Sequence, residues 1–137
     1  MVSVTTDDIR LFLHVLAATI WVGGQLTLAG LVPVLRRAGA DIPKQVARQF
    51  SRIAWPAFGV LILTGIWNVT SVRHSISDDS SYRGTFIAKL VFVALSGVSA
   101  YLHQRATTKR GNAIWGAATG LFALLALFYG ILLNEAG

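Results

Sequence analysis

An apolar stretch without a single charged residue runs from Leu11 to Leu35. It exceeds the roughly 20 residues that a helix needs to cross a bilayer core of about 30 Å. One imidazole, that of His14, lies inside this stretch. Because titratable groups at membrane depth are rarely without a role, the stretch predicts a transmembrane helix with a functional histidine.

The composition of the chain predicts the same class of protein. Hydrophobic residues make up 54% of the 137 residues and charged residues only 13%, about half the charged share of an ordinary soluble domain. We therefore expect an all-α, polytopic integral membrane protein, with one four-helix bundle that occupies residues 1–137. The four spans are expected at about residues 9–35, 43–72, 84–106 and 112–133, from the apolar runs.

Basic residues gather in two of the predicted loops and indicate the orientation of the chain. They are Arg36, Arg37, Lys44, Arg48 and Arg52 in one loop, and Arg105, Lys109 and Arg110 in the other. The positive-inside rule then places both loops on the cytoplasmic side of a prokaryotic cytoplasmic membrane, with both termini outside. The net charge of +6 is thereby explained by topology and by contact with anionic membrane lipid, and no nucleic-acid partner is expected.

Two side chains are expected to share a helix face with His14. Trp21 and Gln25 follow it by seven and eleven residues, which returns both to within about 20° of the same direction. The result is a polar and aromatic stripe that could line a cofactor site. For Trp21, packing between helices is an equally good interpretation.

Further candidate ligands follow from depth in the membrane, counted at about 1.5 Å per residue. Lys89 comes out level with His14 near the outer boundary, and His74 follows the outer end of the second span with Trp67 beneath it. His103 lies about 30 Å from that boundary by the same count and would belong to a separate site. The second metal ligand beside His14 therefore stays open among His74, Lys89 and His103.

The available ligands favour haem b over copper as the cofactor. Neutral imidazole is a standard axial ligand to haem iron, and a four-helix bundle can hold a porphyrin between facing helices. Cu(I) prefers thiolate and thioether ligands, yet the chain has no cysteine and its single methionine is Met1. Cations that could bind porphyrin carboxylates gather toward the outer face, namely Arg10, Arg73, Arg83 and Lys89.

Three segments resemble the CopD-like membrane family. They are the segment from His14 to Gly24, in which tryptophan follows the histidine by seven residues; the segment from Arg48 to Trp67; and the segment from Phe86 to Leu90. Together they cover most of residues 9–105. The same features are similar to HemJ-type protoporphyrinogen oxidases, which bind haem, and that resemblance implies roles for His14 and Lys89.

Three functions stay open at this point. The first is a b-type haem protein that transfers electrons or handles haem, with a quinone or another redox partner. The second is an enzyme, a quinone-coupled porphyrinogen oxidase. The third is a copper-related or purely structural membrane protein in which His14 only forms hydrogen bonds. A homodimer is also expected, because Ser96, Ala100, Gly116 and Gly120 permit close helix contacts.

Overall fold

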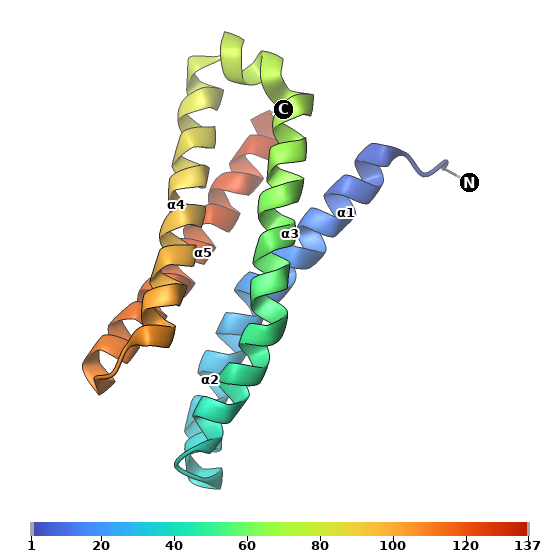
Figure 1. Ribbon diagram of the computed structural model, residues 1–137. Coiled ribbons are helices and arrows are strands. Elements are labelled where there is room, and N and C mark those ends of the chain that lie inside the picture. The colour runs from blue at the N-terminus through green and yellow to red at the C-terminus, as the bar shows by residue number, and fades with distance from the viewer. Residues whose placement is uncertain (1, 137) are drawn as a thin grey trace. The chain divides into compact units, whose positions relative to one another are not determined.

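The computed structural model describes residues 2–136, without the side chains of residues 71, 72, 74, 75 and 134–136. All regular elements in this range are helical, which confirms the all-α prediction. They are α1 (Thr6–Ala18), a π-helical turn η1 (Thr19–Gly23), α2 (Gly24–Ala38), α3 (Ile42–Asp78), α4 (Ser80–Arg105) and α5 (Lys109–Ala136) (Figure 1).

Four helical stretches are long and apolar enough to cross a membrane, as the sequence predicts. They are Thr6–Ala38, Ile42–Thr70, Ser80–Arg105 and Lys109–Leu133. The first begins before the expected residue 9 because Thr5 and Asp8 cap it reciprocally: the Asp8 carboxylate accepts from the Thr5 N–H at 2.8 Å, and the Thr5 hydroxyl accepts from the Asp8 N–H at 3.2 Å. The third begins before the expected residue 84 because Asp79 caps α4: its carboxylate accepts hydrogen bonds from the N–H groups of Ser81 and Tyr82.

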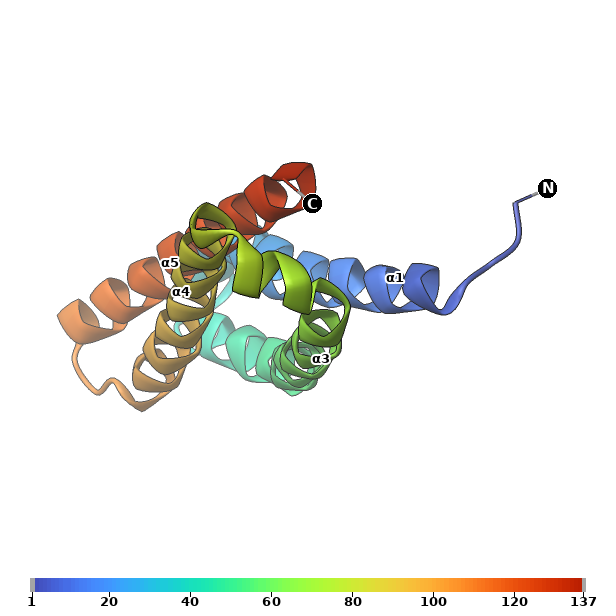
Figure 2. The same ribbon diagram turned by 90° about the horizontal axis from the view of Figure 1, so that it is seen from above.

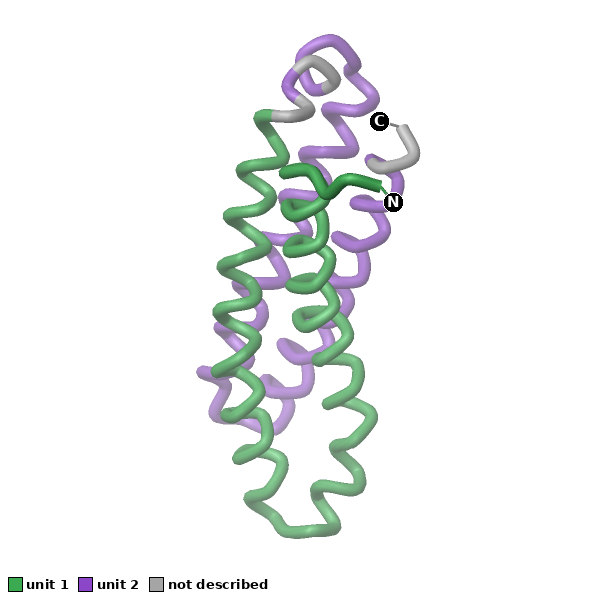
Figure 3. The backbone as a smooth tube through the Cα atoms, turned by 90° about the vertical axis from the view of Figure 1, so that its right-hand side faces the viewer, with its two compact units in different colours: residues 1–70 green, residues 71–137 purple. Residues whose placement is uncertain are grey.

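The chain divides into two compact units, residues 1–70 and residues 71–137 (Figure 3). The first unit contains α1, η1, α2 and most of α3, and the second contains α4 and α5. Each unit has its own interface between antiparallel helices. The expectation of a single domain over residues 1–137 stays a prediction.

In the first unit, side-chain contacts join the first span to α3. Gly24 faces Phe50, Trp21 faces Phe58, and further along His14 faces Thr64. Residue numbers fall along the first span as they rise along α3, as an antiparallel pair requires. Aromatic rings therefore fill the middle of this interface, with polar groups toward the N-terminal end of α1.

The first span is interrupted by the π-helical turn at Thr19–Gly23. Each hydrogen bond in such a turn spans five residues instead of four, so the residues after it lag in rotation. The angles expected for Trp21 and Gln25 relative to His14 assumed a uniform α-helix and do not hold through this turn. Threonine hydroxyls donate to carbonyl oxygens on both sides of it, Thr19 to Val15 and Thr27 to Gly23, each at 2.8 Å.

In the second unit, α4 and α5 lie side by side, as two perpendicular views agree (Figures 1 and 2). Small residues let the helix backbones approach closely in part of this interface, and elsewhere the ring of Phe92 on α4 lies 5.3 Å from that of Tyr129 on α5. Ser96 is 1% exposed, and its hydroxyl donates to the Thr119 carbonyl oxygen at 3.1 Å. The expected contact through Gly116 is present, but a Cβ atom added at Gly120 would meet nothing within 4 Å. The α5 face that packs on α4 instead continues from Gly116 through Thr119, Ala123 and Ala126.

Candidate functional site

His14 on α1 is joined to Thr64 on α3 by a hydrogen bond, with 2.8 Å between Nδ1 and Oγ1. The Thr64 hydroxyl also lies 2.7 Å from the carbonyl oxygen of Val60, one turn earlier in α3, to which it donates. Its one hydrogen is thereby committed, so the hydroxyl oxygen must accept from the imidazole. We therefore assign the proton of neutral His14 to Nδ1.

This tautomer leaves the lone pair of the imidazole on Nε2. Metal-binding histidines usually donate their other ring N–H to a fixed acceptor, which orients the ring and raises its basicity. Thr64 is such an acceptor, because it is 4% exposed and tied to its own helix. The donor chemistry of His14 thus fits an axial ligand to haem iron, and it also fits other metals that bind imidazole.

Trp21 belongs to an aromatic cluster between the first span and α3. Its ring centroid lies 4.5 Å from that of Phe58 and 5.4 Å from that of Trp55, and Trp21 is 4% exposed. Packing between helices, one of the two interpretations of Trp21, is therefore observed. A role for Trp21 in lining a cofactor pocket stays a prediction.

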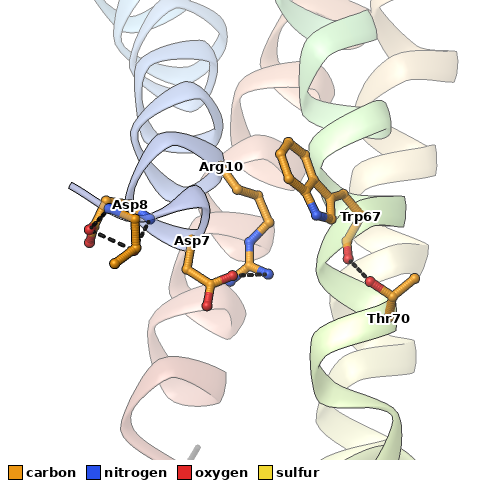
Figure 4. Close-up of polar contacts among 6 residues, drawn as sticks. Asp7, Asp8, Arg10, Trp67 and Thr70 are labelled. Atoms are coloured by element: carbon orange, nitrogen blue, oxygen red, sulfur yellow. Dashed lines mark hydrogen bonds and ion pairs between the residues drawn. The ribbon is translucent and has the colours of Figure 1, made fainter.

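Trp67 and Gln25 lie at different levels of the first unit, and a role for either in a cofactor site stays a prediction. Trp67 follows Thr64 by three residues on α3, and it lies across from Arg10 of α1 (Figure 4). Gln25 is half-buried on α2, and eleven residues of helix separate it from His14, about 16 Å at 1.5 Å per residue. Arg10, His14, Thr64 and Trp67 thus form the candidate site of the first unit.

Lys89 lies in the second unit, where its side chain extends over α5. A Cβ atom added at Gly130 would be 3.4 Å from the Lys89 ammonium nitrogen, so this glycine makes room for the charged end. The expected common site of His14 and Lys89 involves both units and stays a prediction. The side chain of His74, the other proposed ligand, lies outside the described residues.

His103 closes the turn between α4 and α5. Its Nδ1 donates to the main-chain carbonyl oxygen of Asn112 at 2.7 Å. Its ring covers Gly116, where an added Cβ would be 3.0 Å from Cε1. His103 therefore links the end of α4 to the start of α5. Among the residues that the structure describes, no three His, Cys, Asp or Glu side chains are grouped closely enough to hold a metal ion.

Sequence reasoning missed Thr64 as a member of the site. A signal for it exists, since Thr64 is an isolated hydroxyl residue within the otherwise apolar run from Val60 to Ile66. Such a residue in a membrane span often bonds back to its own helix. Its pairing with His14 depends on how the two helices align, which no local pattern encodes.

The family profile described as copper resistance protein D, CopD, matches residues 44–133, about two thirds of the chain. The chain belongs to the CopD family. The CopD match includes Thr64, Trp67, Lys89 and His103 and begins after the span that carries His14. No curated protein and no solved structure matches the chain.

Proposed function

We propose that this CopD-family membrane protein binds haem b, with Nε2 of His14 as an axial ligand, and that it transfers electrons or handles haem. The hydrogen bond between His14 and Thr64 carries the proposal, because it supports the tautomer that a haem ligand needs. A porphyrin supplies four nitrogen ligands to its iron, so one or two protein ligands suffice. Bound haem would supply one-electron chemistry.

The residues around His14 have separate tasks in this proposal. Thr64 fixes the orientation of the imidazole, and the cluster of Trp21, Trp55 and Phe58 fixes the separation of the two helices. His74 or Lys89 would supply the second axial ligand. A quinone in the membrane, or a redox protein, would exchange electrons with the haem.

A copper-related function is the second candidate, and the CopD match favours it. Imidazole binds copper as well as haem iron. A bare copper ion, however, needs several ligands from the protein, whereas a porphyrin brings most of its own. The chain contains no cysteine and one methionine, so a Cu(I) site of the soft type would lack its usual ligands.

Orientation and assembly complete the proposal. The two basic loops would face the cytoplasm of a prokaryotic cell, with both termini outside, as the distribution of arginine and lysine supports. The chain would form a homodimer through the open surface of α5 at Gly120, where an added Cβ meets nothing within 4 Å. Small residues on such a surface allow two helices to pack closely in lipid.

A visible absorption spectrum of the purified protein, with its metal content, tests the proposed cofactor. We expect a sharp Soret band and stoichiometric iron, with the band lost or strongly reduced in His14→Ala. His103→Ala is the matched control, since His103 is engaged at the α4–α5 turn, and it should keep the band. An unchanged Soret band in His14→Ala, or stoichiometric copper without any Soret band, would overturn the proposal.

A further inference from the structure

Three exposed cations lie at the turn that joins α4 to α5 (Figure 1). Arg105 ends α4, and Lys109 and Arg110 begin α5. The ion pair found among the described residues involves none of the three. The sequence also has no aspartate or glutamate between Asp79 and Glu135, so neither helix carries a carboxylate near this turn. Its positive charge is therefore left to the surroundings of the protein.

Hydrogen bonds hold the turn in a compact form. At its base, Nδ1 of His103 donates to the main-chain carbonyl oxygen of Asn112 at 2.7 Å. Within the turn, the Thr108 hydroxyl accepts from the Gly111 N–H at 3.0 Å. Only residues 106–108 lie between the two helices. The three cations thus come from one short segment whose two ends are tied together, and they can act on one ligand.

Tyr101 holds the guanidinium of Arg105 in a defined direction. The Nε and Nη2 atoms of Arg105 donate to the Tyr101 hydroxyl at 3.2 and 2.9 Å, and Cζ lies 5.4 Å from the centre of the tyrosine ring. These bonds use one edge of the guanidinium, two of its five N–H donors. The remaining donors, on Nη1 and Nη2, bond to no described residue. Arg105 therefore offers its terminal fork, already oriented, to a ligand.

We propose that the α4–α5 turn binds the phosphate of an anionic phospholipid, with the terminal fork of Arg105 on the phosphate oxygens and with Lys109 and Arg110 adding positive charge. A planar guanidinium suits this anion because it can bind two oxygens at once. Tyr101 is 50% exposed and lies one helical turn before the end of α4, a place typical of aromatic residues at a membrane–water interface. The fork is thereby held at the level of the lipid headgroups.

A lipid fits this turn better than a free anion because exposed apolar residues continue from the cations into both helices. On α5, Ile114 follows Arg110 by four residues and is 54% exposed; on α4, Val98 precedes Tyr101 by three residues and is 57% exposed. Residues at these spacings share a helix face. Acyl chains would lie along these faces, whereas inorganic phosphate would leave them unused. All residues of this site belong to the second unit, so the proposal is independent of the haem site.

Native mass spectrometry of the whole chain in a neutral detergent measures which added lipid it retains. Phosphatidylglycerol and phosphatidylcholine with the same acyl chains are compared, because both carry a phosphate and only the first has a net negative charge. We expect a preference for phosphatidylglycerol, and Arg105→Gln should lower that affinity about fivefold, the contribution of one basic residue near anionic headgroups. Arg83→Gln, at an exposed arginine near the start of the same helix, is the matched control and should change neither affinity.

Tyr101→Phe tests the orientation of the guanidinium. It keeps the ring and the charge and removes the hydroxyl that accepts from Arg105, so the affinity for phosphatidylglycerol should fall, by up to the same factor of about five. In a chain that already carries Arg105→Gln it should have no further effect, because the group that the hydroxyl orients is gone. Equal losses in both backgrounds would show that the hydroxyl acts only on the fold, and would remove its role in the site.

Other outcomes would overturn the lipid site as a whole. Equal retention of the two lipids by the wild type would show that the turn does not select an anionic headgroup. The same loss in Arg83→Gln as in Arg105→Gln would show that only net charge matters. Inorganic phosphate that competes as well as the lipid does would make this a site for a free anion. If Arg105→Gln does not fold, Lys109→Gln, at an exposed position, permits the same comparison.

Discussion

The ring of Phe50 on α3 rests directly on the backbone of Gly24, the first residue of α2. A methyl group at Gly24 would lie 2.6 Å from the Cζ atom of that ring and would also collide with Cε2. The neighbouring Gly23 has open space, since an added Cβ there meets nothing within 4 Å. The absence of a side chain at Gly24 thus allows the Phe50 ring of α3 to pack against the first span at this level.

We therefore expect Gly24→Ala to destabilise the first unit by about 1–3 kcal/mol, the usual cost of overpacking. Gly23→Ala is the control, and its effect should be neutral or slightly stabilising, because alanine is the better helix former by up to about 1 kcal/mol. Thermal unfolding in detergent, followed by circular dichroism, measures both. Equal losses in the two variants would contradict the contact with Phe50.

Thr64→Val removes the hydroxyl that accepts the His14 proton and keeps nearly the same volume. We expect haem affinity to fall about tenfold to a hundredfold, the typical effect of losing such a supporting hydrogen bond. Thr64→Ser should restore most of the affinity, because it keeps the hydroxyl. Haem titrations of the three proteins provide the measurement, and full affinity in Thr64→Val would show that the hydrogen bond does not support a ligand.

His103→Ala removes the hydrogen bond to the Asn112 carbonyl at the α4–α5 turn. We expect a loss of stability of about 1 kcal/mol, the net value of one such bond, and an unchanged haem spectrum. Chemical or thermal unfolding detects the first effect and absorption spectroscopy the second. A low-spin spectrum that becomes high-spin in this variant would instead make His103 an axial ligand.

Gly120→Leu tests the proposed dimer, because the position is open within the described part of α5. The variant should fold with unchanged stability and shift the detergent-corrected mass from dimer to monomer, as measured by light scattering. Gly116→Leu should destabilise the chain itself, since a Cβ there already approaches the His103 ring to 3.0 Å. A monomeric wild-type protein that carries its full complement of haem would exclude the dimer.

Two single cysteines test the orientation, in a chain that has none of its own. Ser3→Cys should react in intact cells with a thiol reagent that cannot cross the membrane. Thr107→Cys, in the exposed turn between α4 and α5, should react only after the cells are permeabilised. The opposite pattern would reverse the topology that the positive-inside rule predicts.

The helices of this protein were predictable from sequence because each apolar run is a local signal of sufficient length. Even their early starts have local causes, such as the reciprocal cap of Thr5 and Asp8. The pairing of His14 with Thr64 was not predictable, because it depends on the register of two helices far apart in sequence. The π turn was not predictable either, because it produces no change in composition that would reveal it, and a cofactor role for Gln25 stays a prediction.

The π turn at Thr19–Gly23 accommodates one residue more than an α-helical turn would. If the same residues formed a uniform α-helix, the half after the turn would be rotated against the half before it by about 100°. Either the end that carries His14 or the end that carries Gly24 would then turn away from α3. The π turn thus cancels the rotation that one extra residue would add, and the same span can present both His14 and Gly24 to α3.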